Sequence, residues 1–545
     1  MFGAGAMTNS IDEIRGTDLM FVIGSNTTEA HPIIAMEMKR AVRRGAKLIV
    51  ADPRAIWMSR IADIHLQLKP GTDVALLNAM AHVIISEGLI DRDFIAKHTE
   101  DFDRVAGAVR ECTPEWAETL TTVPAADIRT AARWYATTKR AGIYYTLGVT
   151  EHTHGTDNVY GLANLVAMTG HLGRRHAGMN PLRGQNNVQG ANDSGATPIF
   201  LPGYQRVTDA AIREKFEKAW GVPLPAEEGL NLNVMMKSMS KGIIKGLYVI
   251  GEDLVLSEPN ATSIEAGLNQ CEFIAMQDIL PNEMLRFADV ILPAACFAEK
   301  DGVFTNSDRR VQRVRKAVEP PGEARPDWEI ICDVARAVGY PMPRYAHPRE
   351  IYAEMASLVP NYSGISHERI DGTGGLQWPC TSPDHPGTPT LHASGPMRGK
   401  VSFQPIAYRP SAELPDGEYP LILSTGRTLY HYNAGTMTTR SAGASIRQAG
   451  NFIEMHRKDA ARRRIADGEE VRVVSRRGSV VARVNVSPRV RRGCIWMPLH
   501  FAESNVNRLT NDAGDTITGT AEYKVCAVEV EPLSACAGCG PSSTP

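Results

Sequence analysis

The chain lacks any apolar run of roughly 18 residues, the length that a helix needs to span a bilayer. It also lacks an excess of either charge, because 59 Lys and Arg residues balance 61 Asp and Glu residues to a net charge of −2. A surface that binds nucleic acid is strongly basic, so we expect neither a nucleic acid partner nor insertion into a membrane.

Residues 1–7 contain neither a basic segment nor an apolar segment long enough for a signal peptide. The nine cysteines are mostly isolated in the sequence, which is typical of a reducing compartment. These features predict a cytoplasmic protein. Cys536 and Cys539 form a C-x-x-C pair, but they lie in a tail rich in Ser, Gly and Pro, so a flexible tail is favoured over a metal or redox site.

A chain of 545 residues is too long for one hydrophobic core, so several domains are expected. Short apolar runs typical of buried strands occur at residues 19–23, 47–51, 142–146, 247–250 and 273–276. Helical periodicity follows over residues 32–42, and residues 74–87 predict a strongly amphipathic helix. This alternation predicts an α/β fold with doubly wound, mostly parallel sheets.

Polar residues follow these runs. They include Ser25, Asn26, Glu29 and Asp52 in the first part of the chain, then Gly148 and Thr150, Gly251 to Asp253, and Gln277 with Asp278. In parallel sheets, ligands bind at the carboxyl ends of the strands. One acid at such a place is most simply a helix cap. Polar residues at several strand ends favour a nucleotide-like ligand.

Residues 340–410 are rich in Pro and Gly and weakly periodic, so an irregular connection is expected there. Alternating strands at 470–475, 479–485 and 525–530 predict a β-rich C-terminal domain, with residues 476–478 as a hairpin turn. The expected organisation is an α/β domain over 1–185, a second α/β domain with the irregular connection over 186–405, a β domain over 406–531, and a tail over 532–545.

The most distinctive stretch is Pro181-Leu-Arg-Gly-Gln-Asn-Asn-Val-Gln-Gly190. Surface loops favour Lys, Glu, Ser and Pro over neutral amides, so a plain polar loop is the less favoured interpretation. The planar guanidinium of Arg183 suits a carboxylate, and Gly184 and Gly190 let the backbone approach a ligand. The stretch predicts an anion-binding wall.

This stretch resembles the arginine loop of molybdopterin-dependent formate dehydrogenases, in their catalytic alpha subunit. Other motifs match in the family's order: Phe21-Val-Ile-Gly-Ser-Asn-Thr-Thr-Glu-Ala-His-Pro32, Ala51-Asp-Pro-Arg54, Gly251-Glu-Asp253, Gln277-Asp-Ile279, Ala288-Asp-Val-Ile-Leu-Pro293 and Glu522-Tyr-Lys524. The match runs from residue 1 to about residue 531. It implies molybdenum or tungsten bound by two molybdopterin guanine dinucleotides, and a six-stranded C-terminal barrel over the cofactor.

The resemblance also implies site residues. Arg183 would hold the carboxylate of formate, with Gln185 and His154 beside it, although an isolated histidine is equally typical of an exposed surface position. Glu29 and Asp253 would accept from guanine N–H groups. Cofactor contacts are implied for Gly24, Ser25, Asn26, Glu29, Asp52, Arg54, Gly148, Thr150, Asn186, Asn187, Gly251, Glu252, Asp253, Gln277, Asp278, Thr425, Arg427, His431, Asn507 and Lys524.

The implied reaction is oxidation of formate to CO2, with two electrons leaving through pterin and iron–sulfur centres to partner subunits carrying flavin and NAD or further iron–sulfur centres. In the family, a [4Fe–4S] motif and a cysteine or selenocysteine ligand to the metal precede the segment that matches Met1. We therefore expect a truncated reading frame, in which the UGA codon for selenocysteine was read as a stop and the chain was taken to begin at the next start codon. The alternatives are a true gene fragment or a frameshift in a cysteine-type enzyme. No metal ligand is predicted within this chain.

Without those preceding strands, the second α/β domain would be incomplete, with exposed strand edges and apolar faces. The chain alone is then expected to be poorly soluble and inactive. Two other functions stay open: another bis-pterin oxidoreductase such as a nitrate reductase, and a non-catalytic cofactor-binding fragment. The loop around Arg183 favours formate over both.

Overall fold

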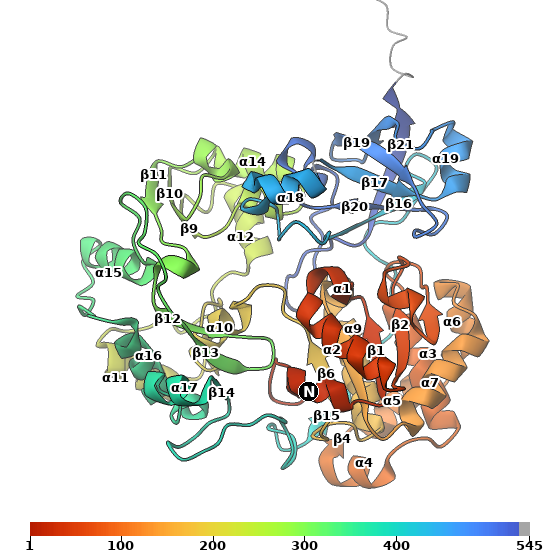
Figure 1. Cartoon of the computed structure of the whole chain (residues 1–545), viewed down its shortest axis with the longest axis horizontal. Helices are drawn as coiled ribbons and strands as arrows, with labels where there is room; N and C mark the ends of the chain where they lie inside the picture. The colour runs from red at the N-terminus through yellow and green to blue at the C-terminus, as the bar shows by residue number, and fades with distance from the viewer. Residues whose placement is uncertain (449, 534–545) are drawn as a thin grey trace, which may run out of the picture.

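The computed structural model describes residues 1–448 and 450–533. The first α/β domain, a middle region with two small sheets, and a C-terminal barrel lie around a common centre (Figure 1). The predicted pair Cys536 and Cys539 lies outside the described residues. No helix in the described part of the chain is long and apolar enough to cross a membrane.

The first domain is built on a five-stranded parallel sheet with the strand order β3-β2-β1-β5-β6. Its strands are β1 (Leu19–Ile23), β2 (Lys47–Ala51), β3 (Ile64–Leu66), β5 (Ala141–Tyr145) and β6 (Gly178–Pro181). Side chains alternate between its faces, so Phe21 packs into one core and Val22 into another. Helices cover both faces, which confirms the doubly wound prediction.

The helix predicted over 74–87 is α3 (Asp73–Ser86), but it is not amphipathic. It packs against three other helices, α6 (Pro114–Thr121), α7 (Ala125–Thr137) and α9 (Gly155–Met168), as well as contributing to the core on the sheet. Most of its residues are buried for that reason. The prediction of the helix is confirmed and the prediction of a solvent-facing side is wrong.

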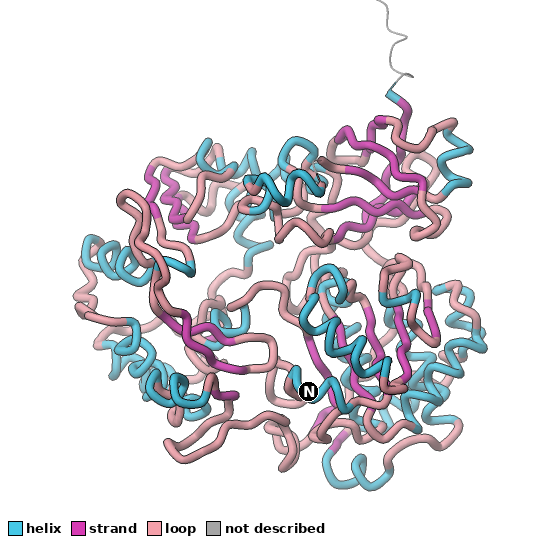
Figure 2. Tube along the Cα trace, viewed as in Figure 1, coloured by secondary structure: helices cyan, strands magenta, loops and turns pink. Residues whose placement is uncertain are grey.

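The middle region contains a three-stranded parallel sheet of β9 (Gly246–Ile250), β10 (Phe273–Asp278) and β11 (Val290–Pro293), at the upper left of Figure 2. One face packs its core with α12 (Leu232–Met239) and α14 (Ala261–Leu268). The opposite face presents Tyr248, Ile250, Phe273 and Val290, which are between 39% and 49% exposed. This face of the sheet is therefore apolar and partly exposed among the described residues, whereas the expectation that preceding strands are missing stays a prediction.

The expected irregular connection over 340–410 is wrong in part. Helices α16 (Pro348–Leu358) and α17 (His367–Thr373) pack with an antiparallel sheet of β12 (Gly302–Thr305), β13 (Arg310–Val314) and β14 (Leu376–Gln377). Tyr352, Tyr362 and Trp378 belong to this core. These large aromatic side chains bury enough apolar area to form a core, although the Pro- and Gly-rich composition of residues 340–410 predicted none.

The chain returns to the first domain before it enters the barrel. Strand β15 (Val401–Ser402) pairs in parallel with β4 (Thr99–Glu100), and Phe403 joins the main core of the first domain. Residues 401–403 therefore pack as part of the first domain, although β15 lies 302 positions after β4, the strand with which it pairs.

The C-terminal region is a closed barrel with the strand order β16-β20-β17-β19-β18-β21. Its strands are β16 (Leu421–Gly426), β17 (Phe452–Met455), β18 (Glu470–Val474), β19 (Ser479–Val486), β20 (Cys494–Pro498) and β21 (Cys526–Pro532). Ser475 N donates to Gly478 O and closes the predicted hairpin. The expected six-stranded barrel is confirmed.

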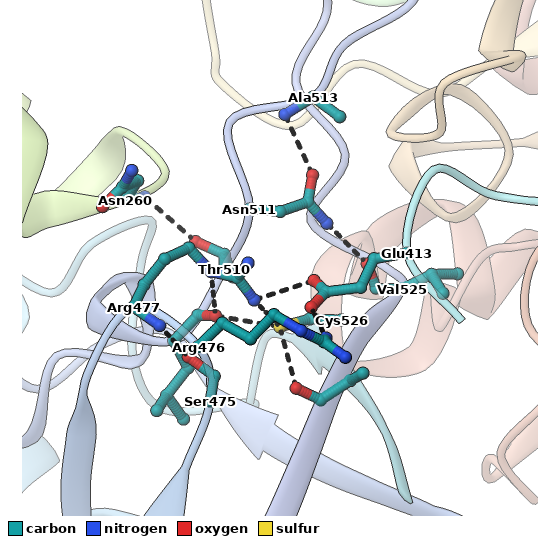
Figure 3. Close-up of polar contacts among 12 residues, drawn as sticks. Asn260, Glu413, Ser475, Arg476, Arg477, Thr510, Asn511, Ala513, Val525 and Cys526 are labelled. Atoms are coloured by element: carbon teal, nitrogen blue, oxygen red, sulfur yellow. Dashed lines mark hydrogen bonds and ion pairs between the residues drawn. The ribbon is translucent and has the colours of Figure 1, made fainter. Parts of the chain in front are cut away.

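A polar network fixes the loop between β20 and β21, residues 499–525, which contacts the middle region (Figure 3). Arg477 donates from Nε to Leu509 O at 3.0 Å and from Nη2 to Glu413 at 2.7 Å. Asn260 N donates to Thr510 Oγ1 at 3.4 Å across the junction. Since Asn507 lies in the same loop, the network also holds a predicted site residue in place.

Candidate functional site

A cavity of about 340 Å³ lies where the first domain, the middle region and the barrel meet. Its walls come from the carboxyl ends of β1, β2 and β5, from the segment after β9, and from barrel strands β16 and β20. The predicted residues that line it are Gly24, Asn26, Glu29, Asp52, Arg54, Gly148, Gln185, Glu252, Thr425, Arg427, Asn507 and Lys524. Residues from the first domain, the middle region and the barrel thus meet in one place, although none of the lining residues lies between positions 259 and 423.

The other predicted residues lie outside this lining: Ser25, Thr150, His154, Arg183, Asn186, Asn187, Gly251, Asp253, Gln277, Asp278 and His431. Asp253 accepts from Leu256 N and Glu283 N, so it is a helix cap, the simpler interpretation of an acid at a strand end. Contact between these residues and a cofactor stays a prediction.

Several of these outlying side chains make bonds that explain their position. Asn187 Oδ1 accepts from Thr305 N at 2.9 Å, and Gln277 Nε2 donates to Asp327 Oδ1 at 2.8 Å. Asp278 accepts from Asn282 Nδ2 at 2.8 Å. The ring of His431 lies between Thr438 Oγ1 and Gln448 O. Each of these polar groups therefore already has a hydrogen-bond partner within the protein.

Gly24 and Gly148 line the cavity where the chain leaves β1 and β5. Gly24 has a φ of +54°, and a Cβ there would lie 2.6 Å from the carbonyl carbon of Gly148. A Cβ on Gly148 would lie 2.5 Å from Gly24 O, the atom to which Gly148 N donates at 3.1 Å. Only glycine fits at either position, so the ends of β1 and β5 can touch and leave room above them.

Unpaired polar atoms show that the cavity suits a polar ligand. Asn26 Nδ2 and Oδ1 and His31 Nδ1 are buried and have no hydrogen-bond partner among the described residues. Both residues line the cavity. Buried polar groups are normally paired, because leaving one unpaired costs about 1–3 kcal/mol. A ligand with donors and acceptors would satisfy these atoms.

The charges of the lining are mixed. Cationic Arg54, Arg427, Arg491 and Lys524 line the cavity together with the acids Glu29, Asp52, Asp73, Glu151, Glu252 and Glu258. Phosphate groups require cations, whereas a ring rich in N–H groups requires acids. The lining therefore suits a ligand that combines phosphates with such a ring.

An ion pair joins the barrel to the first domain at the cavity wall. Arg54 donates from Nε and Nη2 to the carboxylate of Glu454 at 2.6 and 2.7 Å and stacks on Trp496 at 3.8 Å. Arg54 N also donates to Asp52 Oδ1 at 2.9 Å, while burial raises the pKa of the Asp52 carboxyl to about 6. The charge of Arg54 is therefore already balanced within the protein.

Lys524 and Asn507, which lie in the loop between β20 and β21, make further links between the barrel and the other units. Lys524 Nζ lies 2.7 Å from Glu151 and donates to Thr425 O at 3.2 Å. Asn507 Nδ2 donates to Leu256 O at 2.8 Å, which links the barrel to the middle region. The predicted barrel residues thus hold the cavity together as well as line it.

The loop carrying Arg183 lies at the rim of the cavity. Leu182, Gly184 and Gln185 line it, and Arg183 is fixed by its backbone: its N donates to Ser307 Oγ at 3.1 Å and its O accepts from His31 Nε2 at 2.7 Å. The loop is held from both sides of the site.

His152 and Asp73 also line the cavity, and sequence reasoning missed both. His152 Nδ1 lies 3.6 Å from Glu522 and Nε2 lies 4.0 Å from Asp73, and Nε2 bonds to Gly148 O at 3.0 Å. Burial alone would lower the pKa of His152, but the two carboxylates raise it above its ordinary value. The spacing Glu151-His-Thr-His154 was the available signal.

His154 is buried, in contrast to the exposed position that is typical of an isolated histidine. It stacks on His152 with ring centroids 5.6 Å apart, and burial lowers its pKa to about 4. Within the described residues, no group of three or more His, Cys, Asp or Glu side chains could hold a metal ion.

Comparison with known proteins identifies the family. The family model described as molybdopterin oxidoreductase matches residues 2–337, and the molybdopterin dinucleotide binding domain matches residues 421–527. The chain belongs to the molybdopterin oxidoreductase family. It is therefore an oxidoreductase, and the mixed lining of its cavity agrees with a molybdopterin dinucleotide, which combines phosphates with N–H-rich rings.

Relatives of this oxidoreductase match nearly the whole chain. A formate dehydrogenase alpha subunit of Methanococcus maripaludis is 45% identical over 98% of this chain and 79% of its own length. Formate dehydrogenase H of Escherichia coli is 42% identical over 98% and 75%. The assimilatory nitrate reductase catalytic subunit of Bacillus subtilis is 35% identical over 98% and 77%.

The fold is also found in a solved structure. Acetylene hydratase from Pelobacter acetylenicus superposes with a TM-score of 0.74, covering 97% of this chain and 80% of its own, at 19% identity. This likeness shows the fold alone.

Proposed function

We propose that this oxidoreductase is the catalytic subunit of a formate dehydrogenase and oxidises formate to CO2. The observation that carries the proposal is Arg183, whose backbone is held by Ser307 and His31 at the rim of the cavity. A fixed guanidinium can bind a carboxylate through two parallel hydrogen bonds, which orients formate before electrons are removed.

The proposed cofactor is a molybdenum or tungsten ion with two molybdopterin guanine dinucleotides, which accepts the two electrons of the reaction when bound. Asn26 and His31 have unpaired polar atoms to offer it, and Gly24 and Gly148 leave room for it. Arg427 and Lys524 would face its phosphates, and the acids at the strand ends would accept from its rings.

The remaining parts of the proposal are a [4Fe–4S] cluster, a cysteine or selenocysteine ligand to the metal, and electron-transfer subunits. Electron paramagnetic resonance of the formate-reduced native complex tests the cluster. We expect the signal of a reduced [4Fe–4S] cluster, and its absence would contradict this part of the proposal.

The central test expresses the native gene region and measures dye reduction by formate together with molybdenum and tungsten content. We expect formate-dependent reduction, and we expect it to fall in Arg183→Lys, because lysine has no planar fork. A nitrate reductase would instead oxidise reduced dye with nitrate. A non-catalytic fragment would retain metal and show neither activity.

A further inference from the structure

The side chain of Arg183 is held by a buried chain of polar groups that the proposed reaction does not use. Arg183 Nε donates to Gln189 Oε1 at 3.2 Å. Gln189 is fully buried in α10 (Val188–Asp193), so the acceptor of this bond is shielded from water while the bond itself is partly buried. Arg183 Nη2 also donates to Gly5 O at 2.5 Å.

The amide of Gln189 can face Arg183 in only one orientation. Its Nε2 donates to Asp193 Oδ1 at 2.8 Å and to the hydroxyl of Tyr204 at 2.9 Å. A flipped amide would place its oxygen against the Asp193 carboxylate and its NH2 against the Arg183 guanidinium, which would replace both favourable contacts with repulsive ones. The carboxylate therefore sets the direction of the oxygen that receives Arg183.

Asp193 is itself fixed from the other side. It is 1% exposed, and its Oδ2 accepts from Trp378 Nε1 at 2.9 Å. No Lys or Arg within the described residues forms an ion pair with it. A buried carboxylate is costly unless several donors satisfy it, so Gln189 and Trp378 are strongly directed toward it.

These contacts leave one edge of the guanidinium for a ligand. Nε and one hydrogen of Nη2 are used, and Nη1 has no hydrogen-bond partner among the described residues. The two parallel donors that a carboxylate requires are then Nη1 and the second hydrogen of Nη2.

We propose that Gln189 and Asp193 are positioning residues that set the orientation of the Arg183 guanidinium, so that its Nη1–Nη2 edge receives the carboxylate of the substrate. This inference rests on the proposed function. Without Gln189 the guanidinium loses its fixed acceptor and samples other rotamers. Misplacing an orienting group by about 1 Å can cost roughly 100-fold in kcat/KM, and a group that binds the substrate carboxylate acts mainly through KM.

The test compares Gln189→Met with Gln377→Met in the full enzyme. Gln377 is a matched control, because it is also buried, lies in the same region, and donates to Asp308 O at 2.9 Å without touching Arg183. We expect Gln189→Met to raise the KM for formate by roughly tenfold or more, while kcat changes less and Gln377→Met leaves KM unchanged. Equal KM values in the two variants would overturn the proposal.

A second readout does not depend on formate turnover. In protein labelled with ¹⁵N-arginine, the Nε–H resonance of Arg183 is assigned by its loss in Arg183→Lys. We expect the chemical shift of this resonance to change, and its Nε–H proton to exchange faster with water, in Gln189→Met. Neither change is expected in the control Gln377→Met. If the wild type fails to turn over formate, the proposed function fails while this measurement still decides the positioning.

Trp378→Phe extends the test should Gln189→Met fold poorly. It removes the N–H donor to Asp193 and keeps an aromatic ring in the core. We expect the same direction of change in KM and in the Arg183 resonance, with a smaller size. An unchanged resonance in both variants would show that Arg183 is oriented by other contacts.

Discussion

The stability of this protein should depend on the protonation of Glu258, which lines the cavity and is 6% exposed. Burial first, and then the charges of Glu252 and Glu151, raise the pKa of its carboxyl from 4.5 to about 8. Its carboxyl has no hydrogen-bond partner in the part of the chain that the structure describes. Near neutral pH, the folded protein therefore holds a proton on Glu258 that the unfolded chain does not.

The sign of the pH dependence follows from the raised pKa. The folded state binds this proton more tightly, so the contribution of Glu258 to stability is fully present below pH 4.5 and is lost as the pH rises through about 8. A change of this size corresponds to about 5 kcal/mol as an order of magnitude. Glu258→Gln removes the ionisation and should abolish that loss.

The measurement is the thermal unfolding temperature of the purified protein between pH 5 and pH 9. We expect Glu258→Gln and the wild type to unfold at similar temperatures at pH 5, and the variant to become progressively more stable as the pH rises. The control is Glu227→Gln, an exposed glutamate, which should not change the profile. A constant difference between Glu258→Gln and the wild type across this range would refute the reasoning.

Two further predictions concern the Arg54–Glu454 ion pair and the close backbone contact at Gly148. Glu454→Gln leaves Arg54 without its carboxylate partner, so we expect a loss of about 3 kcal/mol in denaturant unfolding, whereas Glu87→Gln, at an exposed pair, should cost under about 1 kcal/mol. Gly148→Ala places a Cβ against the neighbouring backbone, so we expect less bound metal by elemental analysis than in the exposed control Gly443→Ala. Equal losses in either pair would contradict the structure.

The parallel strands of the first domain were predictable because a strand buried on both faces is an uninterrupted apolar run, as at residues 19–23. The polar residues after such strands were equally visible, and Asn26 and Asp52 do line the cavity. Asp253 shows the limit of this signal, because a cap and a ligand contact use the same residue type.

What the sequence could not provide were contacts between distant segments. His152 depends on Glu522, which lies 370 positions later in the chain, so the local spacing Glu151-His-Thr-His154 marked the pair of histidines but did not show which of them meets a carboxylate. The partner of Arg54 is likewise Glu454, 400 positions away. The helices α16 and α17 were missed because the many Pro and Gly residues elsewhere in 340–410 were given more weight than the helical composition of the two segments themselves, and because the aromatic residues that pack against them are dispersed in the sequence.

The cavity is shared by three units that are linked by polar contacts, among them Arg54 with Glu454, Lys524 with Glu151 and Asn507 with Leu256. A dinucleotide bound in that space would contact all three units, so its binding energy would stabilise their association as well as its own retention. The proposed cofactor would then also have a structural role. Removing it should loosen the barrel from the α/β domains before either unit unfolds, and inserting it becomes a late step of folding.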